Sequence, residues 1–245
     1  MARFRARFNR HWRPVHRGVS FSRRSSGMRI WAILLLLIVT ACIPAGRPEP
    51  RAPARRPAAT PARPVLSERA LRQCHADLGR AGVSFQALPD RVFGGGCDAT
   101  AAVKLVAIGT PVTNLGALRC PLALAFSRWV QQVAQVEAER RFDQPLRRID
   151  SFGTYACRPV NGQVGQRLSE HGHANAVDIA AFVLADGTRF TVRDGWAGPD
   201  ARIRDYLHAV HDGACRRFGV VLGPDANAYH RDHFHFDMAS SDYCR

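Results

Sequence analysis

The sequence lacks several features that would place it in a well-defined class. Its seven cysteines include no C-x-x-C pair, which disfavours a structural zinc cluster. No internal repeat is evident. Its apolar run over residues 30–43 is shorter than the roughly 20 residues that an ordinary membrane-spanning helix needs. The length of 245 residues allows one large domain or two small ones.

Most of the chain also lacks a strong net charge. The sequence holds 35 basic and 20 acidic residues, but residues 1–66 contain 14 arginines and a single acid, Glu49. Residues 67–245 therefore carry 21 basic and 19 acidic side chains, and the net charge of +15 belongs mainly to the N-terminal tail. A nearly neutral domain has no electrostatic footprint for DNA or RNA, so we expect no nucleic-acid partner.

Residues 28–42 have the pattern of a secretory signal, because Arg29 precedes the apolar run and small residues follow it. The end of the run, Val39-Thr40-Ala41-Cys42, resembles a bacterial lipobox, with Val39 in place of the usual Leu. In that motif the cysteine is lipidated and becomes the mature N-terminus. The pattern predicts export to the periplasm and a membrane anchor through Cys42. An ordinary signal peptide and an uncleaved short anchor are the alternatives, and Met28 is a candidate start.

Residues 44–66 are dominated by Pro, Ala and Arg and show no apolar period. This composition predicts a semi-rigid, extended linker that holds the next domain away from the membrane. Its arginines would contact anionic lipid or wall polymer. A disordered spacer whose charge has no role fits equally well. We therefore divide the chain into a basic signal segment (1–43), a linker (44–66) and a globular domain (67–245).

The predicted domain contains six cysteines once Cys42 is set aside. An even number of cysteines in an exported domain predicts three disulfides, although the sequence alone does not fix their connectivity. We predict that sequence neighbours pair, as Cys74–Cys97, Cys120–Cys157 and Cys215–Cys244.

Apolar spacing and turn residues predict a mixed order of helices and strands in this domain. Helices are expected over 67–78, 120–141 and 200–218, and strands over 83–88, within 101–113, and over 148–157, 176–183, 189–192 and 233–238. The apolar positions of the 120–141 helix are predicted to face the core: Leu122, Phe126, Trp129, Val130, Val133 and Val136. This order is typical of an α+β domain, with a small antiparallel sheet packed against helices and stapled by disulfides.

Two short motifs contain five of the ten histidines. Residues 169–178 read SEHGHANAVD, and residues 230–237 read HRDHFHFD. Asp178 lies in an apolar run, where a carboxylate is costly unless it is paired or bound to a metal. On a strand, His233 and His235 share one face while Phe234 and Phe236 face the core. These residue types suit a catalytic zinc site, in which three protein ligands leave one position open for water. The alternative is a chance cluster of hydrogen-bonded core histidines.

The first motif resembles the S-x-H-x-x-G-x-A-x-D motif of the LAS zinc peptidases, the superfamily of D-alanyl-D-alanine carboxypeptidases and murein endopeptidases. The second is similar to the H-x-x-H-x-H ending of the penicillin-insensitive murein endopeptidases. With the element Tyr155-Ala-Cys157-Arg158 upstream, the pattern over roughly residues 67–245 is most similar to the bacterial extensin-like C-terminal domain family. "Extensin-like" is a label here and implies no plant-wall protein.

The resemblance implies that His171, Asp178 and His235 bind zinc. It also implies that His233 is the general base that takes a proton from the attacking water. An imidazole suits this role because its unperturbed pKa lies near neutrality.

The remaining roles also come from the resemblance. Arg158 would stabilise the developing oxyanion, with a surface ion pair as the alternative. His230 would be a substrate or supporting contact, and Ser169 would orient the loop or a ligand. No role is implied for His173, which we expect to be exposed. Ala174 replaces the usual Gly, and an Ala is strained if this position needs a positive φ.

Three functions are compatible with these motifs. The first is a zinc-dependent peptidase acting on peptidoglycan stem peptides or cross-links in the periplasm. The second is a non-catalytic peptidoglycan-binding lipoprotein that tethers membrane to wall. The third is a secreted hydrolase for another amide. The presence of His233 favours an enzyme, since a binding module has no need of a base.

Overall fold

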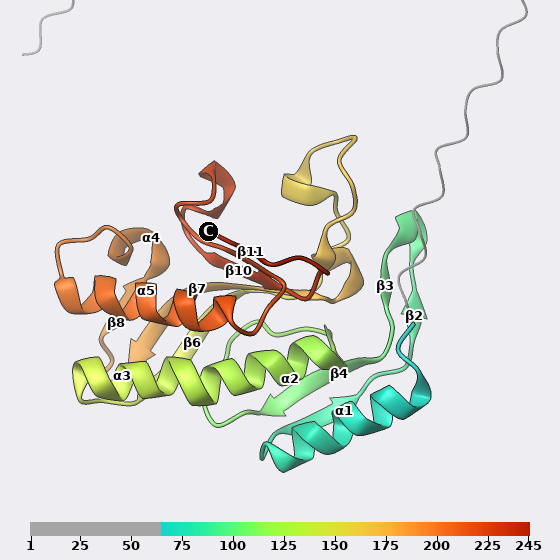
Figure 1. Ribbon diagram of the computed structural model, residues 1–245, viewed down its shortest axis with the longest axis horizontal. Helices are drawn as coiled ribbons and strands as arrows, with labels where there is room; N and C mark the ends of the chain where they lie inside the picture. Colours follow the sequence, from blue (N-terminus) through green and yellow to red (C-terminus); the bar gives the residue numbers. More distant parts are fainter. Residues whose placement is uncertain (1–64) are drawn as a thin grey trace, which may run out of the picture. The chain divides into compact units, whose positions relative to one another are not determined.

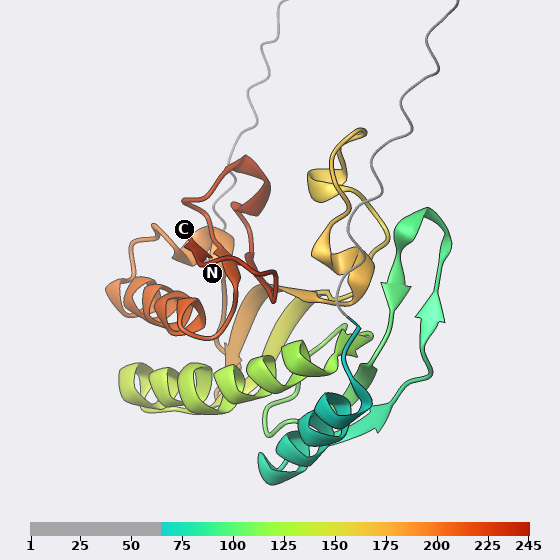
Figure 2. The same cartoon turned by 45° about the vertical axis from the view of Figure 1, so that its right-hand side comes forward.

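The computed structural model describes residues 65–245 (Figures 1 and 2). The signal segment, Cys42 and nearly all of the predicted linker lie outside the described residues, so the predictions made for them stay predictions. Within residues 65–245, no helix is both long enough and apolar enough to cross a membrane.

The N-terminal part of the domain pairs one helix with short strands. Ser67 caps the first helix as predicted, because its hydroxyl accepts a hydrogen bond from the Ala70 amide at 3.2 Å. β1, β4 and β5 form an antiparallel sheet, while β2 and β3 form a separate hairpin. The elements are α1 (Glu68–Arg80), β1 (Ser84–Ala87), β2 (Arg91–Val92), β3 (Asp98–Ala99), β4 (Ala102–Ala107) and β5 (Leu118–Arg119).

The predicted helix over 120–141 is present as α2 (Cys120–Trp129), a π-helical turn (Val130–Ala134) and α3 (Gln135–Phe142). Five of its six predicted core residues are buried, but Val136 is 49% exposed, so that prediction was wrong. The π turn adds a residue to the helical repeat and thereby rotates the side chains of α3 about the helix axis. The buried face of α3 is therefore carried by Ala138 rather than by Val136.

A second sheet carries the rest of the chain. Its order is β11-β9-β10-β7-β6, with β8 paired to β7, and all of its pairs are antiparallel except β11 with β9. Its elements are β6 (Leu146–Gly153), β7 (Ala176–Leu184), β8 (Arg189–Thr191), α4 (Val192–Gly195), α5 (Ala201–Cys215), β9 (Val220–Leu222), β10 (Phe234–Asp237) and β11 (Tyr243–Cys244). The predicted α+β class is confirmed.

Side-chain alternation gives this sheet one apolar face and one polar face. Phe234 and Phe236 are fully buried, and Trp129 from α2 packs edge-on against Phe236 with ring centres 5.1 Å apart. In Figure 1, α2 and α3 lie below the sheet, while the loop coloured yellow and the red loop before β10 rise above it. The polar side chains of β7 and β10 therefore lie on the face that the helices leave uncovered.

Three disulfides staple the domain, but two of the predicted pairings were wrong. Cys215–Cys244 is present as predicted and joins α5 to β11. The other bonds are Cys74–Cys120 and Cys97–Cys157. α1 packs on α2, which brings Cys74 to the start of α2, and the β2–β3 hairpin extends toward the segment after β6. Pairing follows these spatial neighbours rather than order along the chain.

Candidate metal centre

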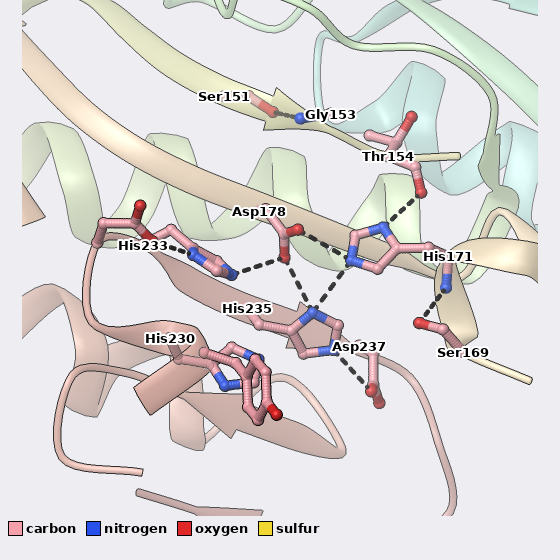
Figure 3. A network of polar contacts seen from close by, with 12 residues as sticks. Ser151, Gly153, Thr154, Ser169, His171, Asp178, His230, His233, His235 and Asp237 are labelled. Carbon is pink, nitrogen blue, oxygen red and sulfur yellow. Dashed lines mark hydrogen bonds and ion pairs between the residues drawn. The ribbon is translucent and has the colours of Figure 1, made fainter. Parts of the chain in front are cut away.

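Two neighbouring strands and one turn bring the three predicted ligands together (Figure 3). Asp178 on β7 and His235 on β10 lie directly opposite each other in the antiparallel register, so their side chains share a face. His171 comes from a 3₁₀ turn over Glu170–His173 that immediately precedes β7. All three residues are buried.

The donor atoms of these residues form a compact triangle. Nε2 of His171 lies 3.1 Å from Oδ2 of Asp178 and 3.2 Å from Nδ1 of His235. Nδ1 of His235 lies 2.9 Å from Oδ1 of Asp178. Ligands of a tetrahedral zinc at about 2.0–2.1 Å are about 3.3 Å apart, so a small expansion of this triangle fits the ion. Two imidazoles and a carboxylate are also a donor set that suits zinc.

Each imidazole is oriented by a hydrogen bond from its other nitrogen. His171 donates its Nδ1–H to the backbone carbonyl of Thr154 at 2.9 Å, which leaves the Nε2 lone pair aimed at the centre. His235 donates its Nε2–H to Oδ2 of Asp237 at 3.0 Å. Sequence reasoning missed Asp237, although its place two residues after His235 puts it on the same face of β10. Such outer partners fix which nitrogen faces a metal.

The electrostatics of the triangle leave a cation between two carboxylates. Burial would raise the pKa of Asp178, but its close contacts with the His171 and His235 imidazoles hold it far below its usual range. Burial would likewise lower the pKa of His235, but its bonds to Asp178 and Asp237 raise that pKa to about 9. In the metal-free protein, a proton on His235 therefore supplies the positive charge that a metal would otherwise bring.

This proton makes metal uptake dependent on pH. Because the pKa of His235 is raised to about 9, the ring stays protonated below that pH and the metal must displace the proton. We expect zinc affinity to rise about tenfold per pH unit between pH 6 and 8, with about one proton released per ion. Calorimetric titration in buffers of different ionisation enthalpy measures both quantities. An affinity that is constant over this range would contradict the assignment.

His233 lies beside the triangle rather than in it. Its Nε2 is 3.7 Å from Oδ1 of Asp178, and its Nδ1–H donates to Oδ1 of Asp232 at 2.9 Å. Asp232 also accepts from Arg193 at 3.0 Å. Burial would raise the pKa of Asp232, but the hydrogen bonds from His233 and Arg193 lower it. This chain of contacts holds Nε2 of His233 toward the ligands, where it can accept a proton.

His230 is placed near both histidines of the strand. Its ring centre is 5.1 Å from that of His233 and 5.7 Å from that of His235, and its Nδ1 bonds to Oδ1 of Asn227 at 2.8 Å. Burial, reinforced by the neighbouring His235 and His233, lowers its pKa to about 4. His230 is therefore neutral at pH 7, which suits a contact to an uncharged group.

The turn that carries His171 is held by its own polar residues. Ser169 caps it, since its hydroxyl accepts from the His171 amide at 3.3 Å. Asn175 donates to Oε2 of Glu170 at 2.6 Å, and both side chains are buried. His173 was predicted to be exposed, but its side chain is only 17% exposed and bonds to Asp98. That prediction was wrong because the β2–β3 hairpin lies against this turn.

Ala174 adopts a left-handed conformation, with φ of 52° and ψ of 30°, and is fully buried. A Cβ in this region is strained by about 1 kcal/mol or more. We therefore expect Ala174→Gly to stabilise the domain by about 0.5–1 kcal/mol, after allowing for the lost methyl contacts. Urea unfolding of both proteins measures the difference. A clear loss of stability in the glycine variant would show that packing of the methyl outweighs the strain.

A cavity of about 340 Å³ opens over the triangle and is lined by all three ligands, His230 and His233. An adjoining cavity of about 370 Å³ shares His171, Asp178 and His233 with it. Arg158 lines both, and within residues 65–245 its side chain forms no ion pair or hydrogen bond. Arg158 therefore borders the space above the ligands, close enough to His230 to help lower the pKa of that imidazole.

The comparisons with known proteins identify the family of the chain. The family model described as "Extensin-like protein C-terminus" matches residues 72–245. The chain belongs to this family. The match spans both histidine motifs and the whole second sheet. No curated protein and no solved structure matches the chain.

A second group of potential ligands exists in this extensin-like domain. His211, Cys215 and Cys244 bring their donor atoms within 4.8 Å of one another. Both sulfurs are joined in a disulfide, so neither offers a thiolate. The triangle of His171, Asp178 and His235 is therefore the better candidate for a metal centre.

Proposed function

We propose that this extensin-like domain is a zinc-dependent amide hydrolase that cleaves peptidoglycan peptides in the cell envelope. The observation that carries the proposal is the oriented donor set. Two imidazoles and one carboxylate converge within 3.2 Å, each imidazole is fixed by a bond from its other nitrogen, and a cavity opens above them. Structural zinc sites are closed by four protein ligands, whereas three ligands under a cavity favour catalysis.

The side chains around the triangle supply the remaining parts of a hydrolytic site. Zinc bound there would polarise the scissile carbonyl and make a water acidic enough to attack at neutral pH. His233, held by Asp232, would accept the proton of the attacking water and return it to the leaving amine. Arg158, which lines the cavity, would stabilise the negative charge that develops on the carbonyl oxygen.

The substrate class rests on sequence. The two motifs resemble those of the LAS peptidases of the cell wall, and the signal-like segment predicts export to the compartment that contains peptidoglycan. The wall-tethering lipoprotein remains the alternative, since it would keep the fold without turnover. His233 and its support from Asp232 favour the enzyme.

Digestion of purified sacculi tests the proposal. We expect the zinc-loaded protein to release soluble muropeptides, to lose this activity in a chelator and to regain it with zinc. Unrelated peptides serve as the control and should stay intact. Binding to sacculi without any release would refute the peptidase and favour the tether, and cleavage of the unrelated peptides would indicate another amide substrate.

A further inference from the structure

A cavity of about 460 Å³ lies next to the metal centre without containing any of its ligands. Its walls come from three separate segments: the β2–β3 hairpin, the stretch before β5 and the end of β6. Leu88, Pro89, Phe93, Phe152 and Tyr155 make these walls mainly apolar. Concave apolar surfaces of this size are typical of ligand sites.

The aromatic residues of this cavity are unusually accessible. Phe93 is 38% exposed and Phe152 is 54% exposed, which makes them the most exposed phenylalanines of residues 65–245. Tyr155 lies beside Phe93, with ring centres 5.3 Å apart. The Phe152 ring instead lies edge-on to His233, with ring centres 5.6 Å apart. Exposed aromatic side chains that line one hollow point to an interaction site, because contiguous exposed apolar surface is otherwise disfavoured.

The walls of the cavity are held in place covalently. The Cys97–Cys157 disulfide joins the hairpin that carries Phe93 to the segment that carries Tyr155. The Cys157 sulfur of this disulfide also lies 3.7 Å from the carbonyl oxygen of Gly94 in the hairpin. The hollow therefore exists before any ligand binds, and little ordering is needed for occupation.

Polar groups accompany these aromatic walls. Asn114 donates to the carbonyl of Phe152 at 2.8 Å, which leaves its side-chain oxygen free to accept. The Thr154 hydroxyl accepts from the Gly116 amide at 3.0 Å, which leaves its hydrogen free to donate. Arg91 is the sole charged residue of the lining. Aromatic faces with donors and acceptors beside them match a neutral ring that has apolar faces and polar edges, such as a sugar.

The cavity adjoins a second cavity that borders the metal centre. The adjoining cavity of about 370 Å³ shares Phe152, Gly153, Thr154 and Tyr155 with it. Two of these residues also contact ligands, since Gly153 pairs with Asp178 across the strands and the Thr154 carbonyl accepts from His171. A group bound among the aromatic rings therefore lies next to the cavity that borders the ligands.

We infer that this aromatic cavity is a sugar subsite, which binds an N-acetylated amino sugar of the glycan strand while the attached peptide lies at the metal centre. The inference rests on the proposed function for the identity of the substrate. It takes the sugar as occupant because the peptidoglycan peptides offer no neutral ring, and because the lining has no carboxylate to hold an amine.

Direct binding of N-acetylglucosamine oligomers to the full chain tests this inference without turnover. We expect the trimer to bind, Phe93→Ala to weaken binding at least tenfold and Tyr155→Phe to weaken it a few-fold. Val106→Ala removes a still more exposed apolar side chain outside the cavity and should change nothing. Thermal unfolding of each variant controls for folding. Absence of binding, or equal binding by wild type and Phe93→Ala, would overturn the inference.

Cleavage separates this inference from the proposed function. We expect muropeptides that retain their sugars to be cut with a higher kcat/KM than the same peptides without sugars, and Phe93→Ala to abolish that preference. Sacculus digestion with no sugar binding would overturn the subsite and leave the peptidase standing. Sugar binding without digestion would refute the peptidase and leave the subsite.

Discussion

Replacement of His233 by alanine is expected to lower the rate of sacculus digestion about 10²–10⁴-fold while zinc content stays unchanged. The imidazole lies outside the ligand triangle, with its Nε2 3.7 Å from Asp178 and its Nδ1–H bonded to Asp232. Its removal therefore deletes the proton acceptor without deleting a ligand. Single-turnover rates on sacculi, together with zinc analysis of the same samples, measure the two effects separately.

Arg231→Ala is the matched control for this experiment, because Arg231 is exposed in the same loop two residues away. We expect that variant to digest sacculi at the wild-type rate. Loss of zinc from His233→Ala would mean that His233 is itself a ligand. Retention of the full rate would mean that another group accepts the proton.

Replacement of Asp237 by alanine is expected to weaken zinc binding about 10–100-fold, although Asp237 contacts no metal. The carboxylate accepts the Nε2–H of His235 at 3.0 Å and so keeps the opposite nitrogen aimed at the centre. The variant also loses one cause of the raised His235 pKa, so protons compete less strongly with zinc for that imidazole. Affinities are therefore compared near pH 9 with a competing chelator, where this second effect is small.

Asp232→Ala is the counterpart, since Asp232 supports His233 in the way that Asp237 supports His235. We expect it to slow sacculus digestion and to leave zinc affinity within a few-fold of wild type. If both variants lost zinc equally, the two carboxylates would act only through the general field of the site. The assignment of Asp237 to the metal ligand His235 and of Asp232 to the base His233 would then be wrong.

The sequence was sufficient to predict the two strands that carry Asp178 and His235, but not β9 and β11 beside them. Alternation in His233–Met238 placed Phe234 and Phe236 in the core and His235 on the opposite face, as the structure shows. The costly carboxylate of Asp178 in an apolar strand was equally informative, because it lies opposite His235 in the register. These predictions depend on the alternation of side chains between the two faces of a strand. That alternation is a local property and is visible in the sequence itself.

Features that depend on distant contacts could not be predicted. The bond from His171 goes to a backbone carbonyl of Thr154, which any residue would supply, so no side-chain pattern marks it. The pairing of Cys97 with Cys157 depends on where the β2–β3 hairpin lies in space. The exposure of Val136 depends on a single π turn that shifts the phase of an otherwise regular helical pattern.

The most direct test of the central claim is the zinc content of the purified protein, wild type beside His235→Ala, followed by sacculus digestion with both. His235 contacts both Asp178 and Asp237, so its loss opens the triangle and removes a ligand. We predict about one zinc per wild-type chain with release of muropeptides, and loss of both in the variant. A wild-type protein that binds no zinc would contradict the account and make the histidine cluster purely structural.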